Sequence, residues 1–185
     1  MGGGACNYTR RVPGMLDCIN LPATASMSIR LFRPGDEAAL FRVFHSAIHM
    51  VCARDYSAAQ CAAWAPAQMD MAEWAERMRL LAPFVVEHEG EIIAYADLQP
   101  SGYIDHFFVS GQHQRQGTGG LLMARIHEDA ARHGILELTS HVSLTAEPFF
   151  RHYGFEVVHR RYPVRNGVTL EYARMRKALG RASDT

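Results

Sequence analysis

The hydrophobic pattern of this chain changes its period at Pro83, and this change constrains the fold more than any other feature. Before Pro83, apolar residues recur at helical spacing from Leu40 to Val51. After it, residues 84–88 and 91–98 form two apolar, strand-like runs separated by the turn at Glu89-Gly90, which predicts a β-hairpin. Helices followed by paired strands predict a mixed α/β domain.

The rest of the chain extends this order. We expect a strand at 28–32, helices over 36–51 and 56–81 with a break near Pro66, a strand at 103–109, a helix at 117–133, a strand at 135–142, a short helix at 146–153 and a hairpin of 155–164 with 168–177. Asp36 lies at the N-cap position of the first helix. Residues 1–26, rich in Gly and Pro, predict a poorly ordered N-terminal extension, residues 27–180 form the folded domain, and 181–185 form a tail.

The composition limits the partners. Of the 185 residues, 48% are hydrophobic, which is enough for a core without disulfides or a structural metal. Lys and Arg total 19 and Asp and Glu total 19, and this balance argues against a nucleic-acid partner and against a polybasic membrane surface. No apolar stretch approaches the roughly 20 residues of a membrane-spanning helix. The cysteines form no CxxC pair, so we expect reduced thiols in a cytoplasmic protein.

The stretch from Val109 to Leu122 carries the clearest chemistry. A predicted strand runs into a loop whose glycines, Gly117, Gly119 and Gly120, lie at the start of an amphipathic helix. Unpaired N–H groups of a first helical turn bind anions, and glycine lets a ligand approach the backbone closely. The glycines could equally serve a tight strand-to-helix turn. No Lys-Ser/Thr follows the glycines, which excludes a Walker A loop, and the spacing GxGG differs from the GxGxxG of the dinucleotide fingerprint.

A second motif lies downstream, AEPFFRHYGF at 146–155. Together with the run Gln114-Arg115-Gln116-Gly117-Thr118-Gly119, it resembles the GCN5-related N-acetyltransferase (GNAT) superfamily over roughly 28–177. The resemblance implies a mixed, mostly antiparallel central sheet flanked by helices and splayed between the fourth and fifth strands, so that 27–180 is an acetyltransferase domain.

The resemblance also implies acetyl-CoA as co-substrate. Backbone amides around 115–120 would hold the pyrophosphate, the backbone N–H near Val109 would stabilise the oxyanion, and Ser143 stands where many members have an Asn. The implied cofactor-binding residues are Phe107, Phe108, Val109, Gln114, Arg115, Gln116, Gly117, Thr118, Gly119, Gly120, Ser143 and Phe150.

The acid and base are less clear. Side-chain alternation along 103–109 would point Asp105 the same way as Val109, so Asp105 is the candidate general base; a buried counter-ion is the alternative. The family's acid is a Tyr, but this chain has Phe150 there, which cannot donate a proton. Tyr153 is the candidate substitute, with plain aromatic packing as the alternative.

The resemblance implies that the acceptor is an amine on a small molecule or a protein. Tyr56, Trp64 and Tyr103 are the expected substrate-lining residues, although core packing explains the first two equally well. His45 and His49 lie one helical turn apart without an evident third ligand, so no metal is expected.

The expected activity is N-acetyl transfer by direct attack of the amine. The alternative is a catalytically silent acyl-CoA-binding or regulatory module, and a homodimer is compatible with either.

Overall fold

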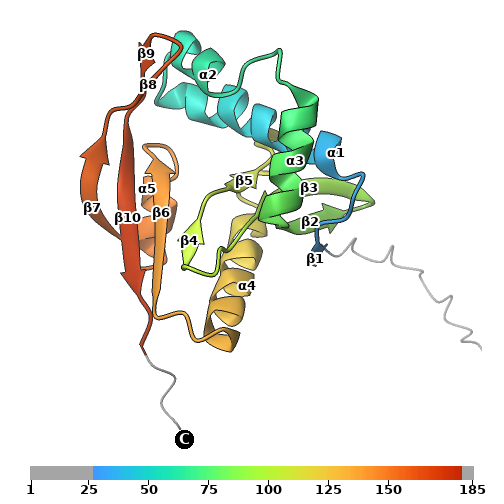
Figure 1. The fold of residues 1–185 in the computed structure, drawn as a ribbon, viewed down its shortest axis with the longest axis vertical. Coiled ribbons are helices and arrows are strands. Elements are labelled where there is room, and N and C mark those ends of the chain that lie inside the picture. Colours follow the sequence, from blue (N-terminus) through green and yellow to red (C-terminus); the bar gives the residue numbers. More distant parts are fainter. Residues whose placement is uncertain (1–26, 181–185) are drawn as a thin grey trace, which may run out of the picture.

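The computed structural model describes residues 27–180 (Figure 1). Its strands are β1 (Ser28–Leu31), β2 (Phe84–His88), β3 (Glu91–Ala96), β4 (Tyr103–Ile104), β5 (Phe107–Val109), β6 (Glu137–Ser143), β7 (Glu156–Arg161), β8 (Val164–Arg165), β9 (Val168–Thr169) and β10 (Tyr172–Ala178). Its helices are α1 (Glu37–Ser46), α2 (Ala58–Trp64), α3 (Met71–Leu81), α4 (Thr118–Arg132) and α5 (Glu147–His152), with a π-helical turn η1 (Ala47–Val51) and the 3-10 turns η2 (Cys52–Arg54) and η3 (Gly111–His113). The predicted extension 1–26 and tail 181–185 lie outside the described residues.

The longer strands form two sheets. One has the order β1-β2-β3-β5 and the other β4-β6-β10-β7, while β8 and β9 form a separate hairpin. Figure 1 shows the second sheet on the left, with α5 beside it, and the first sheet on the right, next to α1, α3 and α4. Among the strand pairs of residues 27–180, β4 with β6 alone is parallel. The predicted mixed, mostly antiparallel α/β architecture is therefore confirmed.

The strand expected at 103–109 is divided in two. β4 pairs with β6, whereas β5 pairs with β3, and Asp105 and His106 connect them without strand pairing. Ile104 and Phe107, three residues apart, both pack in the same core cluster, which continuous alternation would not allow. The expectation that Asp105 and Val109 share one face of a single strand is thus wrong, because the chain changes sheets between them.

Two hydrophobic clusters cover the two faces of the β1-β2-β3-β5 sheet. Leu122, Met123 and Ile126 of α4 pack beneath it together with Val86 and Ile93. Helices α1 and α3 pack on the opposite face, with the buried residues Leu40, Val43, Phe44, Trp74, Met78, Val85, Ile92 and Tyr95. Successive residues of β2 and β3 alternate between the two clusters, except that the adjacent Ile93 and Ala94 both enter the first. Both faces of this sheet are therefore buried, and β5 is held at a fixed position.

The predicted helices form with small differences. The break near Pro66 separates α2 from α3 as expected, and α1 continues into η1. Asp36 precedes α1, but its carboxylate does not cap the helix. Instead, it accepts hydrogen bonds from Arg30 Nη1 and from Arg33 N, both at 2.7 Å. No helix within 27–180 combines the length and apolarity needed to cross a membrane.

Candidate active site at the divergence of the two sheets

Strand β5 leaves backbone N–H groups free on one edge. On its other edge, Ser110 N donates to Ile93 O (2.8 Å) and His106 O accepts from Asp97 N (3.1 Å). Because such bonds recur on alternate residues of an antiparallel pair, the N–H groups of Phe107 and Val109 point away from β3. The edge of β5 that faces β6 therefore presents unused hydrogen-bond donors.

Strand β6 turns away from β5. It pairs with β4 at Thr139 and Ser140, and residues 141–143 pair with β10 on the far side. Within 27–180, no strand lies between these residues and β5. This divergence is the splay expected from the family resemblance.

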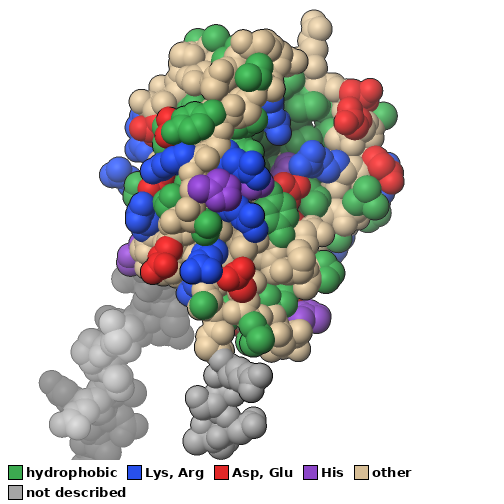
Figure 2. All heavy atoms as spheres, turned by 60° about the vertical axis from the view of Figure 1, so that its left-hand side comes forward, with side chains coloured by type: hydrophobic (Ala, Val, Ile, Leu, Met, Phe, Trp, Pro, Cys, Tyr) green, Lys and Arg blue, Asp and Glu red, His purple; other side chains and the backbone are tan. Residues whose placement is uncertain are grey.

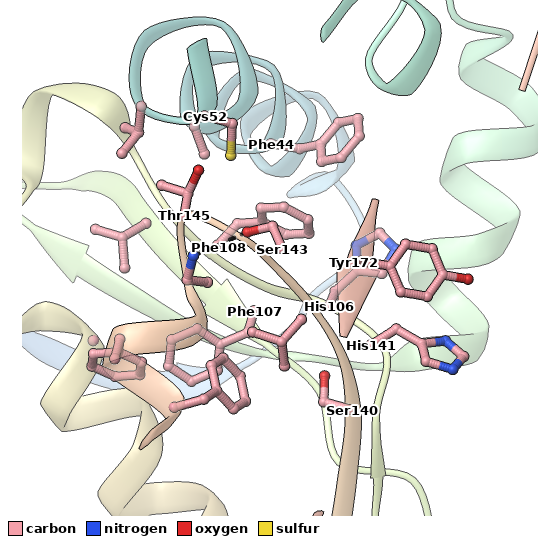
Figure 3. A pocket seen from close by; sticks show the side chains of 18 of the residues that line it. Phe44, Cys52, His106, Phe107, Phe108, Ser140, His141, Ser143, Thr145 and Tyr172 are labelled. Atoms are coloured by element: carbon pink, nitrogen blue, oxygen red, sulfur yellow. Dashed lines mark hydrogen bonds between the residues drawn. The ribbon is translucent and has the colours of Figure 1, made fainter. Parts of the chain in front are cut away.

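The divergence contributes to a cavity of about 900 Å³, a volume typical of small-molecule sites. The glycine-loop half is lined by Phe107, Phe108, Val109, His113, Gln114, Arg115, Gly117, Thr118, Gly119, Gly120, Ser143, Phe149, Phe150 and Tyr153. The histidine half is lined by Trp64, Glu73, Arg77, Tyr103, Asp105, His106, His141, Arg165, Glu171 and Tyr172. Figure 3 shows His106, His141 and Tyr172 grouped on one side of the cavity.

The loop before α4 is built to expose its backbone. Gln114 Nε2 donates to Val109 O (2.8 Å) and Ser110 O (3.0 Å), which ties the loop to the end of β5. Arg115 and Gly117 take positive φ angles of 60° and 83°. Helix α4 then begins at Thr118, and no side chain of residues 27–180 caps its first N–H groups. The helix dipole and these donors together form an anion-binding site.

Gly119 and Gly120 also serve packing. A Cβ atom on Gly119 would lie 3.1 Å from the Phe149 ring, and one on Gly120 would lie 3.0 Å from Tyr153 Oη. The absence of side chains here lets α5 approach the start of α4. Both readings of the glycine run, close packing and ligand approach, are therefore compatible with the geometry.

An aromatic wall occupies the position of the missing tyrosine. Phe150 is 2% exposed, and its ring centroid lies 5.5 Å from that of Phe107 and 5.0 Å from that of Phe155. Tyr153 packs on Phe149 at 4.9 Å, with its hydroxyl near Gly120. The candidate acid thus lies in the cavity beside the start of α4.

Asp105 enters the histidine half as part of an ion pair. Its Oδ2 lies 2.7 Å from Arg77 Nη2 of α3. Its Oδ1 accepts a hydrogen bond from Tyr103 Oη (3.4 Å), which also lies 3.1 Å from His141 Nδ1. Burial and the charge of Asp105 raise the pKa of Tyr103 to about 12, so this hydroxyl keeps its proton at neutral pH. Both of the alternative roles for Asp105, base and counter-ion, fit this arrangement.

Asp97, which was not among the predicted site residues, holds the two residues that separate β4 from β5. Its carboxylate accepts hydrogen bonds from the backbone N–H groups of Asp105 (3.1 Å) and His106 (2.6 Å), and from Gln99 Nε2 (2.6 Å). Burial raises the pKa of Asp97 to about 6. The sequence feature that could have indicated this role is the position of Asp97, a single acidic residue directly after the apolar run of β3.

His106 is buried in the histidine half. Its Nδ1 lies 2.9 Å from Tyr95 Oη, and burial lowers the pKa of His106 to about 4. The ring is therefore neutral at physiological pH. The ring is thus a core histidine whose Nδ1 has a hydrogen-bond partner, and it also lines the cavity.

Small polar side chains line the wall beside Ser143. The Ser143 Oγ accepts a hydrogen bond from Ala146 N (3.1 Å), and Thr145 Oγ1 donates to Asp55 (2.6 Å). Figure 3 places Cys52 near both hydroxyls. Burial raises the pKa of the Cys52 thiol, which argues against a nucleophilic role.

Two predicted ligand residues lie outside the cavity lining, Gln116 and Tyr56. Tyr56 is 5% exposed, and its hydroxyl donates to Glu171 O and accepts from Leu144 N. It therefore supports the wall, whereas Trp64, packed against it at 5.6 Å, lines the cavity. The described residues hold no group of three His, Cys, Asp or Glu side chains suited to a metal ion.

Comparison with known proteins decides the family. Residues 52–179, more than half of the chain, match the model of the acetyltransferase (GNAT) domain. The chain belongs to the GNAT family. Membership classes it as an acyltransferase, with acetyl-CoA as co-substrate.

Individual GNAT relatives extend the match. YafP, an uncharacterised N-acetyltransferase of Escherichia coli K12, is 31% identical over 133 residues, which are 72% of this chain and 83% of that protein. A GCN5-related N-acetyltransferase from Rhodopseudomonas palustris has a TM-score of 0.79 at 28% identity, covering 84% of this chain and 97% of that one. YncA from Salmonella typhimurium, solved with acetyl-CoA, shares the fold at a TM-score of 0.61 and 20% identity, covering 87% and 98%.

Proposed function

We propose that this GNAT protein transfers the acetyl group of acetyl-CoA to an amine by direct attack. The observation that carries the proposal is the alignment of two donor sets: the free N–H edge of β5 and the uncapped start of α4. Both donor sets border the same cavity, which is lined by Phe107–Val109 of β5 and by residues 117–120 at the start of α4. The free N–H groups of a strand edge can bind amide groups of a ligand, and those at the start of a helix can bind its phosphates.

Acetyl-CoA supplies a thioester, from which the acetyl carbon passes to nitrogen as the carbon–sulfur bond breaks. In this proposal the amides of 115–120 hold the pyrophosphate, while Phe107 and Phe150 exclude water. The N–H of Val109 stabilises negative charge on the acyl oxygen. The acetyl-CoA bound to YncA supports a related use of the fold.

The amine must lose one proton and the departing thiolate must gain one. Asp105 remains the proposed proton acceptor, since its carboxylate lines the cavity close to β5 and is oriented by Arg77. Tyr153 remains the proposed donor. Because a free thiol has a pKa of about 8.5, the thiolate leaves readily, and the donor contributes little.

A thiol-release assay across a panel of amines, paired with acetyl-CoA calorimetry, tests the proposal. We expect binding together with amine-dependent thiol release. Binding without release would favour a silent acyl-CoA-binding module, for which the buried Phe150 is the supporting observation. Absence of binding would refute both functions.

The remaining expectations stay predictions. They are a small-molecule or protein amine as acceptor, no nucleic-acid partner, a cytoplasmic location and a homodimer as a compatible state.

A further inference from the structure

Within residues 27–180, three arginines in or next to the lining of the histidine half lack partners. Arg161 of β7, Arg165 of β8 and Arg174 of β10 make no salt bridge or side-chain hydrogen bond within 27–180. Their neighbours differ: Arg160 pairs with a carboxylate at 2.6 Å and Arg176 with one at 3.9 Å.

These three arginines lie together. Arg174 is opposite His141 on β6, and Arg161 is opposite Tyr172 on β10. Arg165 lines the cavity together with His141 and Tyr172. Figure 2 shows basic and histidine side chains gathered on this face beside a hollow. Arg165 is thus part of the cavity lining, and Arg161 and Arg174 lie next to the lining residues Tyr172 and His141.

The electrostatic field of these arginines reaches into the cavity. Burial lowers the pKa of His141, and the positive charges of Arg161 and Arg174 lower it further. Among the carboxylates of this half, Asp105 is paired with Arg77, and Glu171 lies 4.0 Å from an arginine. Glu73 is the one cavity carboxylate of residues 27–180 without such a partner. Within residues 27–180, the three unpaired arginines in or next to this half thus outnumber its one unpaired lining carboxylate.

We infer that the acceptor is an amine that also carries an anionic group, a carboxylate or a phosphate, which Arg165 binds at the mouth with Arg161 and Arg174 beside it. The inference rests on the proposed function and names its substrate class. Guanidinium groups suit both anions because they present several donors in one plane. The same field disfavours a protonated ammonium, so it assists the deprotonation that attack requires.

Matched acceptors test the inference by thiol release: 4-aminobutyrate against 4-aminobutanamide, and O-phosphoethanolamine against ethanolamine. We expect at least about tenfold higher kcat/KM for the anionic member of one pair, and the pair that responds identifies the anion. Arg165→Gln should remove this preference and leave acetyl-CoA affinity unchanged. Arg176→Gln, on the same sheet but paired with Glu137, is the control and should retain it.

Equal rates within both pairs, faster neutral amines, or a preference unaffected by Arg165→Gln would overturn the inference while leaving the proposed function intact. If no amine releases thiol, the proposed function fails first. Calorimetry of the CoA-saturated protein then decides the inference with two pairs of acetylated products: 4-acetamidobutyrate against 4-acetamidobutanamide, and O-phospho-N-acetylethanolamine against N-acetylethanolamine. Equal affinities within both pairs overturn it, and tighter binding of the anionic member of either pair supports it.

Discussion

The two halves of the cavity use different parts of the chain. The glycine-loop half relies on backbone N–H groups from one continuous segment, β5 through the start of α4. The histidine half relies on side chains from α2, α3, β4, β6, β8, β10 and the loops beside β4 and β10, which meet only in the folded protein. Backbone donors suit a ligand shared across a family, whereas side chains can change from one member to the next. Under the proposed function, the first half holds acetyl-CoA and the second half selects the acceptor.

The largest expected effect comes from the histidine half and tests whether Asp105 is the general base. Asp105→Asn should lower kcat by about 100-fold and alter its pH profile, because general-base catalysis contributes at least that much. Acetyl-CoA affinity, measured by calorimetry, should not change. Arg77→Gln is the matched variant, since it breaks the same 2.7 Å ion pair from the other side. Equal losses in both variants with unaltered pH profiles would make Asp105 a counter-ion.

The junction between the halves should respond to pH. Since burial raises the pKa of Asp97 from 3.8 to about 6, its protonated form stabilises the fold; that contribution is complete below about pH 4 and is lost as pH rises through 6. Asp97→Asn should remove this dependence, so its free energy of unfolding relative to the wild type should rise by about 2 kcal/mol between pH 4 and 7. Urea titrations at both pH values measure it. A constant difference would contradict the assigned environment.

Two glycines at opposite ends of α4 allow the effect of a substitution on acetyl-CoA binding to be distinguished from its effect on backbone strain. Gly117 and Gly134 both have positive φ, 83° and 65°, and a Cβ on either would meet no atom within 4 Å. Ala at either position should cost a similar amount of stability, on the order of 1 kcal/mol. Only Gly117→Ala should weaken acetyl-CoA binding, by about tenfold. Equal affinities in the two variants would remove the loop from the binding site.

The smallest effect concerns the proton donor. Tyr153→Phe should reduce kcat by about threefold, because the thiolate is already a fair leaving group. Tyr153 packs against Phe149, so a purely structural role would change the melting temperature without changing the kcat of the folded fraction. Measuring both quantities on one preparation separates these roles.

The same contrast explains what the sequence could predict. The glycine loop, the helix after it and the motif at 146–155 are local, so their geometry follows from turn and helix rules, and the element order predicted the mixed sheet. The division of 103–109 was missed because it depends on the Asp97 carboxylate bonding to Asp105 and His106, eight and nine residues away. The Arg77–Asp105 pair spans 28 positions and leaves no pattern in the sequence.

Tyr56 shows that residue type alone does not predict which side chains contact the substrate. An aromatic residue near an expected pocket suggested a substrate contact, yet its hydroxyl bonds to the backbone of Glu171 and Leu144. The direction in which a buried side chain points is set by packing between distant elements, and single-sequence periodicity does not contain it.

Product stoichiometry tests the central claim most directly. The purified protein is incubated with acetyl-CoA and an amine that the panel identifies, and free thiol and acetylated amine are quantified together by mass spectrometry. Direct acetyl transfer predicts one acetylated amine for each thiol released, with negligible release when the amine is omitted. Thiol release that does not depend on the amine, or amine-dependent release without acetylated product, would contradict it.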